Sequence, residues 1–315
     1  MQSVPPYFPF VFRLCRSTPP LTDGEEIPTQ TSTEEDDLSK ETPLQREDPS
    51  KDDCLNILMI GNSFCSYYLD ELHGMLSAAG IKAKVCRLYY SGCSVEQHWT
   101  WLQTDEKNYD YRVVSGTGTV ANFSGFSLKK ALAQENWDVV TLQQHFSLRR
   151  TETYEIALNS TQSYTKKLYQ YIEGKLPFST FYWQQTWAFQ VGYDRSDGKV
   201  TNVAEQTHQY EMIRLVSDFL AKENNVSIIP SGDAWQLARA NPLLGDNLTR
   251  DLYHDGETGG GQYLNACVWF EVLTQKSCLD NSFRPSYELN EEKVAALKEA
   301  AHAAVSNRYG ANYAK

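Results

Sequence analysis

The sequence predicts an α/β fold in which helices cover both faces of a parallel β-sheet. Short apolar runs with no polar face alternate along the chain with stretches whose apolar residues recur at helical spacing. Strands buried on both faces and connected by helices are typical of parallel sheets, because the crossover helices pack on those faces. Polar residues and glycines follow the ends of the expected strands, which is where such sheets bind ligands.

Five strands are expected. The first is the run 54–60, which reads CLNILMI and ends at Gly61. The stretch 105–125 interrupts the alternation with tyrosines and three glycines, so we expect an irregular insertion there, such as a hairpin. The other apolar runs that we expect to be strands are 81–89, 138–142, 178–184 and 226–229.

Helices are expected between these strands. Residues 64–79 carry apolar side chains at helical spacing and end at Gly80, a residue type common at helix C-termini. The same periodicity predicts helices over 126–135, 154–173, 203–223 and 231–240, and two more that close the chain, over 261–275 and 290–308.

The first 52 residues differ in composition from the rest of the 315-residue chain. They hold eight of the twelve prolines, more acidic than basic residues, and few large apolar side chains after residue 22. Such a segment buries too little surface to offset its ordering entropy, so we predict a disordered acidic arm over 1–52 and one domain over 53–315. The apolar start, PPYFPFVFRLC, leaves two interpretations open: a remnant of an export segment or tether, or a plain disordered arm.

Composition argues against several functional classes. The formal net charge of −11 at pH 7 argues against a nucleic acid as partner, because phosphate binding needs a basic surface. No apolar run approaches 18 residues, so no membrane-spanning segment is expected. The seven cysteines form no CxxC pair and HExxH is absent, so we expect no metal site. Nothing in the sequence implies an organic cofactor.

A serine follows the first strand directly, in the turn Gly61-Asn62-Ser63-Phe64. There the hydroxyl of Ser63 would lie at the edge of the sheet, and its N–H would lie at a helix N-terminus, which favours negative charge. An acyl-transfer nucleophile needs this exposure and a nearby oxyanion donor. The alternative for Ser63 taken alone is a plain helix cap.

A base for this serine is expected in the polar loop that reads TRDLYHDG. Asp251 precedes His254 by three residues in that loop. A carboxylate at this spacing can accept the Nδ1–H of the imidazole, which leaves Nε2 free to take a proton from a serine.

Together these residues resemble the block order of the SGNH/GDSL hydrolases. GNSF follows the first strand, Gly92 follows the second, polar residues follow the third, and D-x-x-H lies near the C-terminus. The resemblance implies Ser63 as nucleophile, the Gly92 N–H as an oxyanion donor, and Asp251 with His254 as the activating pair. It also implies a three-layer α/β/α sandwich with a parallel sheet of about five strands. The segments GNSF, WDVVTLQQ and ACVWFEVLT make the chain similar to the DUF4886 group of SGNH-like proteins.

Two features depart from the superfamily pattern. The first block reads GNS rather than GDS, which keeps the turn, and no GxND follows the third strand. In the superfamily, the asparagine of that block donates its side-chain N–H to the oxyanion, and a glutamine carries the same donor on a longer arm. Either Gln144 or Gln143 is therefore expected to complete the oxyanion hole, because adjacent strand residues face opposite sides.

A substrate wall is expected after the fourth strand, where the chain reads WQQTW. Indole faces stack on sugar rings and amide side chains bind hydroxyl groups, although core packing is an equally ordinary role for such residues. The residues expected to contact the substrate are Trp183, Gln185, Trp187, Tyr253 and His145.

The sequence therefore predicts a serine esterase that removes short acyl groups, acetyl first, from a glycan or another small-molecule ester. Two alternatives stay open. One is a catalytically silent carbohydrate-binding protein on a hydrolase scaffold, which the absence of GxND favours, and the other is a lipase or thioesterase of the same superfamily. The expected substrate favours a place outside the cytoplasm, whether periplasmic, secreted or tethered to the surface.

Overall fold

The computed structural model describes residues 44, 48, 53–144, 146, 154–195, 198–254 and 259–314. Almost all of the expected arm 1–52 lies outside the described residues, and so does His145.

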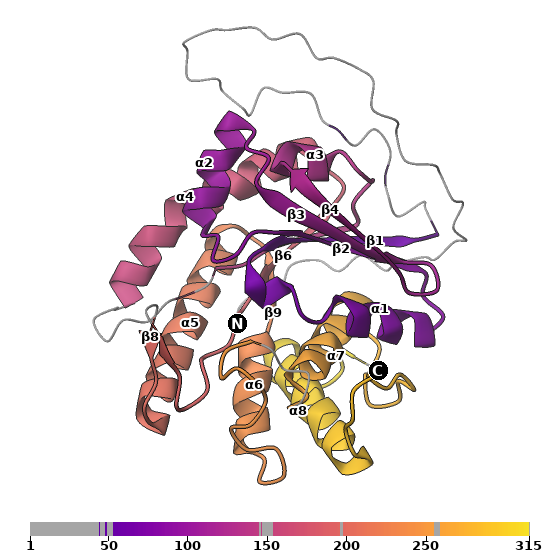
Figure 1. Ribbon diagram of the computed structural model, residues 1–315, viewed down its shortest axis with the longest axis vertical. Coiled ribbons are helices and arrows are strands. Elements are labelled where there is room, and N and C mark those ends of the chain that lie inside the picture. Colours follow the sequence, from indigo (N-terminus) through magenta and orange to yellow (C-terminus); the bar gives the residue numbers. More distant parts are fainter. Residues whose placement is uncertain are drawn as a thin grey trace, which may run out of the picture.

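A seven-stranded sheet forms the centre of the domain, and its strands lie in the order β4-β3-β2-β1-β5-β6-β9 (Figure 1). The five strands from β2 to β9 in this order pair in parallel, and β3 and β4 pair antiparallel at one edge. A separate two-stranded hairpin consists of β7 (Asp194–Arg195) and β8 (Gly198–Lys199). The strands of the main sheet are β1 (Leu55–Gly61), β2 (Ala83–Tyr89), β3 (Tyr109–Ser115), β4 (Thr119–Phe126), β5 (Val139–Leu142), β6 (Thr180–Gln184) and β9 (Ser227–Ile229).

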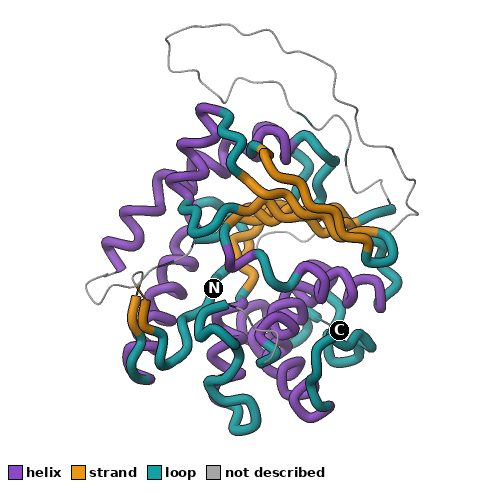
Figure 2. The backbone as a smooth tube through the Cα atoms, in the orientation of Figure 1, coloured by secondary structure: helices purple, strands orange, loops and turns teal. Residues whose placement is uncertain are grey.

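Helices cover both faces of this sheet, which gives a three-layer α/β/α sandwich, as expected (Figures 1 and 2). The first layer comprises α1 (Leu69–Ala78), α6 (Ser231–Ala240), α7 (Gly261–Thr274) and α8 (Glu291–Tyr309). The second comprises α2 (Val95–Thr104), α3 (Leu128–Leu132), α4 (Tyr154–Lys175) and α5 (Val203–Glu223).

The central strand β1 shows why this sequence builds two cores. Its residues alternate between the faces, so Ile57 and Met59 pack with the first helix layer and Leu58 and Ile60 pack with the second. All four side chains are fully buried. Burial on both faces requires a strand without a polar face, and this explains the continuous apolar run in the sequence.

The parallel register brings the carboxyl ends of the strands to one edge. Gly61 of β1 pairs with Tyr89 of β2, and Ile60 pairs with Leu142 of β5. Leu142 pairs in turn with Trp183 of β6. The loops that follow these strands therefore start side by side, although up to about 120 residues separate them along the chain.

The expected insertion at 105–125 is a hairpin. Its strands β3 and β4 pair antiparallel with each other, and β3 pairs antiparallel with β2, so the hairpin widens the sheet beyond β2.

Two helices differ from the expectation. The expected helix 64–79 is divided into a short 3-10 turn, Ser63–Cys65, and helix α1. Helix α2 was not predicted at all, although its N-cap Ser94 and the residue Gln97 fit the S-x-x-Q capping pattern. The hydroxyl of Ser94 accepts a 3.1 Å hydrogen bond from the Gln97 N–H.

None of the helices within the described ranges combines the length and apolar character that a bilayer crossing needs.

Candidate active site

Ser63 occupies the first position of the 3-10 turn that follows β1, and only 8% of its surface is exposed. The preceding residue, Asn62, caps this turn because its Oδ1 accepts a 3.2 Å hydrogen bond from the Phe64 N–H. Its Nδ2 donates a 2.9 Å bond to the carbonyl oxygen of Cys93, in the loop after β2. One asparagine side chain thus joins the serine turn to the neighbouring loop.

Gln143 supports this turn from the end of β5. Its buried Nε2 donates a 2.8 Å hydrogen bond to Oδ1 of Asn62. The amide lies so close to Gly61 that a Cβ added at Gly61 would approach Nε2 to 2.4 Å, which explains why a glycine stands there. Because Gln143 is fully buried and its amide is engaged by Asn62, it does not face a substrate, contrary to one of the two expectations for the oxyanion hole.

Gln144 has the opposite orientation, as alternation along a strand requires. It is partly exposed, and its Oε1 accepts a 2.9 Å hydrogen bond from the Val95 N–H at the start of α2. Since the oxygen of the amide is held by this donor, the Nε2 group is the side that can donate to another acceptor.

Gly92 lies in the exposed loop that follows β2, with φ of +66°, a conformation that favours glycine. One backbone hydrogen bond holds this loop against the end of β1, and a second closes the loop on itself. The Tyr90 N–H donates to the Gly61 carbonyl at 3.3 Å, and the Cys93 N–H donates to the Tyr90 carbonyl at 3.2 Å. The loop of Gly92 therefore lies beside the turn of Ser63.

Asp251 lies directly beside the imidazole ring of His254. Its Oδ2 lies 2.8 Å from Nδ1 of the imidazole. Its Oδ1 accepts hydrogen bonds from the backbone N–H groups of Tyr253 and His254, at 3.0 and 2.9 Å. Because backbone bonds anchor the carboxylate, it can orient the ring, and Nε2 is left on the opposite side of the imidazole.

The His254 ring packs against residues of the serine turn, which places the D-x-x-H loop beside β1. Its centroid lies 6.1 Å from that of Phe64, the residue after Ser63, and 4.6 Å from that of Tyr67. Tyr253, which we expected near the substrate, is buried, and its ring centroid lies 4.0 Å from that of His254. The fold thus brings the loop of Asp251 and His254 against Phe64, the residue that follows Ser63.

The structure does not form the expected wall of tryptophans. Trp183 is fully buried, and its Nε1 donates a 3.1 Å hydrogen bond to Ser217 Oγ on α5. Trp187 is also buried, because its ring stacks on Trp235 with centroids 4.5 Å apart. A platform for a sugar ring needs an exposed indole face, so neither tryptophan provides one.

Gln185 is likewise a buried structural residue rather than part of a substrate wall. Its Nε2 donates to Asp233 Oδ1 and its Oε1 accepts from the Asp233 N–H, both at 2.9 Å. These two bonds fix the start of helix α6 and engage both ends of the amide.

Two exposed tyrosines were missed by the sequence analysis. Tyr67 is 36% exposed and packs on His254, and Tyr90 is 39% exposed and meets Trp101 edge-on at 4.7 Å. The position of these tyrosines in the sequence could have identified them. Each lies in the loop after one of the first two parallel strands, where a ligand is expected.

Within the part of the chain that the structure describes, no three His, Cys, Asp or Glu side chains are grouped so that they could hold a metal ion.

Comparisons with known proteins place the chain in a family. Its structure is similar to that of a DUF4886 family protein from Bacteroides uniformis ATCC 8492, with a TM-score of 0.72 and 30% sequence identity, over 82% of this chain and 96% of that one. A more distant likeness is to Axe2, an acetylxylan esterase from Geobacillus stearothermophilus, with a TM-score of 0.44 and 13% identity, over 73% and 95% of the two chains. No curated protein matches the chain at a significant level. The sequence profile described as "Domain of unknown function (DUF4886)" matches residues 56–304. The chain therefore belongs to the DUF4886 family.

Proposed function

We propose that this chain is a serine esterase of the SGNH type that removes short acyl groups, acetyl first, from a carbohydrate. The observation that carries the proposal is the position of His254. Its Nδ1 lies 2.8 Å from Asp251 Oδ2, and its ring packs against Phe64, the neighbour of Ser63. These contacts support a triad of nucleophile, base and orienting carboxylate drawn from two distant segments, as acyl transfer requires.

In the proposed reaction, Ser63 Oγ attacks the carbonyl carbon of the ester while His254 Nε2 takes its proton. The ester C–O bond then breaks, and the imidazolium returns the proton to the departing sugar oxygen. Water attacks the resulting acyl-enzyme with the same base, which releases the acid and restores Ser63. Asp251 orients the ring and stabilises its charged form in both steps.

Three donors support the negative oxygen of the tetrahedral intermediate in this proposal. Two are the backbone N–H groups of Ser63 and Gly92, in adjacent loops. The third is Nε2 of Gln144, whose amide orientation is set by the Val95 N–H. Such donors act in the transition state, where charge develops on the oxygen.

The carbohydrate part of the proposal rests on exposed aromatic rings. Both Tyr67, which follows the Ser63 turn in the same loop, and Tyr90, in the loop after β2, are partly exposed. Tyrosine faces stack on the C–H faces of sugar rings, and their hydroxyls bind sugar hydroxyls. In this proposal the two tyrosines have the stacking role that we expected of tryptophans.

The test is hydrolysis of p-nitrophenyl acetate, p-nitrophenyl butyrate and acetylated xylan by the full chain and by Ser63→Ala. The matched control is Ser77→Ala, which changes an exposed serine on α1. We expect Ser63→Ala to lower kcat on the order of 10⁴-fold or more, since the nucleophile is removed, and Ser77→Ala to behave as the wild type. Equal rates for the wild type and Ser63→Ala on all three substrates would overturn the esterase proposal.

A further inference from the structure

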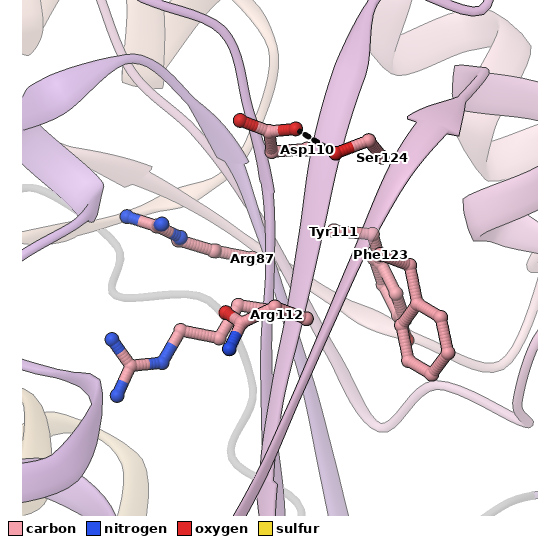
Figure 3. Close-up of a pocket in the computed structure, with 7 residues that line it drawn as sticks. Arg87, Asp110, Tyr111, Arg112, Phe123 and Ser124 are labelled. Carbon is pink, nitrogen blue, oxygen red and sulfur yellow. Dashed lines mark hydrogen bonds between the residues drawn. The ribbon is translucent and has the colours of Figure 1, made fainter.

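Two arginines lie directly opposite each other on the neighbouring strands β2 and β3. Arg87 of β2 pairs in register with Arg112 of β3. Their side chains extend to the same side of the strands, away from the rings of Tyr111 and Phe123 (Figure 3). Like charges at directly opposed positions of an antiparallel pair destabilise the sheet. A negative group near the pair would offset this repulsion.

Arg87 pairs in register with Met59, two residues before the end of β1, and its side chain reaches the turn that carries Ser63. Tyr89 pairs with Gly61, the last residue of β1, and Arg87 lies only two residues before Tyr89 on the same strand. Arg87 Nη1 also donates a 3.2 Å hydrogen bond to the carbonyl oxygen of Ser66, which caps the turn of Ser63. A group bound by Arg87 would thus lie beside the substrate of Ser63.

Most of the donors of this pair have no protein acceptor among the described residues. A guanidinium carries five N–H donors. Arg87 donates to Ser66, and Arg112 donates from Nη2 to Asp70 Oδ2 at 2.5 Å. The buried Nε atoms of both arginines have no hydrogen-bond partner in the described part of the chain.

Burial makes the positive charge of Arg87 costly. Desolvation lowers its pKa, and the charge of Arg112 also acts to lower it. An anion between the two guanidinium groups would offset both effects, and the planar fork of arginine matches oxygen pairs of carboxylates and sulfates.

Two carboxylates compete for these arginines, but both are exposed. Asp70 is paired with Arg112, and its side chain is 52% exposed. Asp110 is also exposed and accepts a 2.9 Å hydrogen bond from Ser124 Oγ (Figure 3). Solvent screens exposed charges more than half-buried ones, so the two aspartates only partly neutralise the pair. The cavity at this place has a volume of about 180 Å³ and is lined by Arg87, Asp110, Tyr111, Arg112, Asn122, Phe123 and Ser124.

We propose that Arg87 and Arg112 form a subsite for an anionic group, a carboxylate or a sulfate, on the sugar that carries or adjoins the ester. This inference rests on the proposed function and narrows its substrate class to acidic glycans. Asp70 acts in it as an internal competitor that holds Arg112 in place when the subsite is empty.

The experiment is a calorimetric titration of the full chain at low ionic strength with three trisaccharides: trigalacturonate, a sulfated galactotriose and neutral galactotriose. Because none of them contains an ester, binding is measured independently of hydrolysis. We expect the wild type to bind at least one anionic trisaccharide more tightly than the neutral one, and the tighter of the two anions identifies the group. Arg112→Gln should weaken that binding about tenfold, the value of one charge-assisted contact.

The variant Asp70→Asn distinguishes anion binding by Arg112 from a purely structural role of the Arg112–Asp70 ion pair. Both Asp70→Asn and Arg112→Gln break the same salt bridge, but Asp70→Asn frees a guanidinium and should tighten the anion. Arg214→Gln, which removes an arginine from a comparable exposed ion pair with Asp218 on α5, should leave the affinity unchanged. The proposal is overturned if the wild type does not prefer either anionic sugar, if Arg112→Gln keeps the wild-type affinity, or if Asp70→Asn weakens binding as Arg112→Gln does.

Discussion

The side-chain amide of Gln143 donates a 2.8 Å hydrogen bond to Oδ1 of Asn62. The residue that follows β5 therefore orients the residue that precedes Ser63. Asn62 in turn bonds to the Cys93 carbonyl in the loop of Gly92. Three loops that carry proposed catalytic groups are thus joined through two buried amides, and the close approach of Gln143 to Gly61 makes this connection testable.

We predict that Gly61→Ala destabilises the fold by about 1–3 kcal/mol, the usual range for overpacking a filled site. The new Cβ would lie 2.4 Å from Gln143 Nε2, so either the amide or the strand end must move. Urea unfolding measures the loss of stability, and kcat on p-nitrophenyl acetate should fall with it because the Ser63 turn is displaced.

A second substitution and a glycine control sharpen this prediction. Gln143→Ala should relieve the clash, so the double variant should lose less than the sum of the two single variants. A coupling of about 0.5–3 kcal/mol is expected for two groups in contact. Gly174→Ala on α4 is the control, since a Cβ there meets nothing within 4 Å and helix propensity favours alanine. Strict additivity of Gly61→Ala and Gln143→Ala would show that the two sites are not in contact.

The oxyanion role of Gln144 predicts a loss in kcat without a loss of stability. Gln144→Glu can keep the bond to the Val95 N–H, but it places an acceptor where the donor stood. Both Gln144→Glu and Gln144→Ala should lower kcat about 10²- to 10³-fold and change KM little, as is usual when one oxyanion donor is removed. Steady-state kinetics on p-nitrophenyl acetate gives both constants. A wild-type kcat in Gln144→Ala would remove this residue from the mechanism.

Features that depend on a local pattern could be predicted from the sequence, whereas the burial of individual side chains could not. The strand β1 could be predicted, and Ser63 and His254 could be proposed as site residues, because an apolar run and a polar D-x-x-H loop are local patterns. The burial of Trp183 and Trp187 could not be found, because their partners Ser217 and Trp235 lie 34 and 48 residues away along the chain. Long-range packing of this kind leaves no local pattern in the sequence.

Helix α2, after β2, and the two glutamines after β5 differ in what a sequence can show. Helix α2 had a readable start signal in Ser94 and Gln97, so its omission was a missed local pattern. The choice between Gln143 and Gln144, by contrast, could not be made from a local pattern. It depends on which side of β5 faces the turn after β1, and only the register between the strands determines that.

The carbohydrate proposal predicts a substrate-dependent effect of Tyr90. Tyr90→Ala should raise KM for an acetylated xylo-oligosaccharide about fivefold, which corresponds to roughly 1 kcal/mol of lost stacking. Phe178→Ala is the control, because Phe178 is also an exposed aromatic residue, in the loop between α4 and β6 at the amino end of β6. Equal KM values for the wild type and Tyr90→Ala would contradict a stacking role.

His98 predicts how stability changes with pH. The ring is fully buried beside Gly92's loop, and its Nδ1 lies 2.9 Å from the Tyr109 hydroxyl. Burial lowers the pKa of His98 from 6.5 to about 3. The unfolded chain therefore binds one more proton than the folded chain between these two values. The free energy of unfolding should be unaffected by this group above pH 6.5 and should fall by about 1.4 kcal/mol for each unit below it.

His98→Phe tests this because it keeps a ring in the same space and removes the titration. The variant loses the hydrogen bond to Tyr109 and should be less stable than the wild type at pH 8, but its stability should decline less steeply between pH 6.5 and 4. His208→Gln, which changes an exposed histidine on α5, should keep the wild-type slope. Urea unfolding at pH 8, 6, 5 and 4 measures all three slopes. A wild-type slope in His98→Phe would assign the acid sensitivity to other groups, of which His73 on α1 is the first candidate because burial lowers its pKa as well.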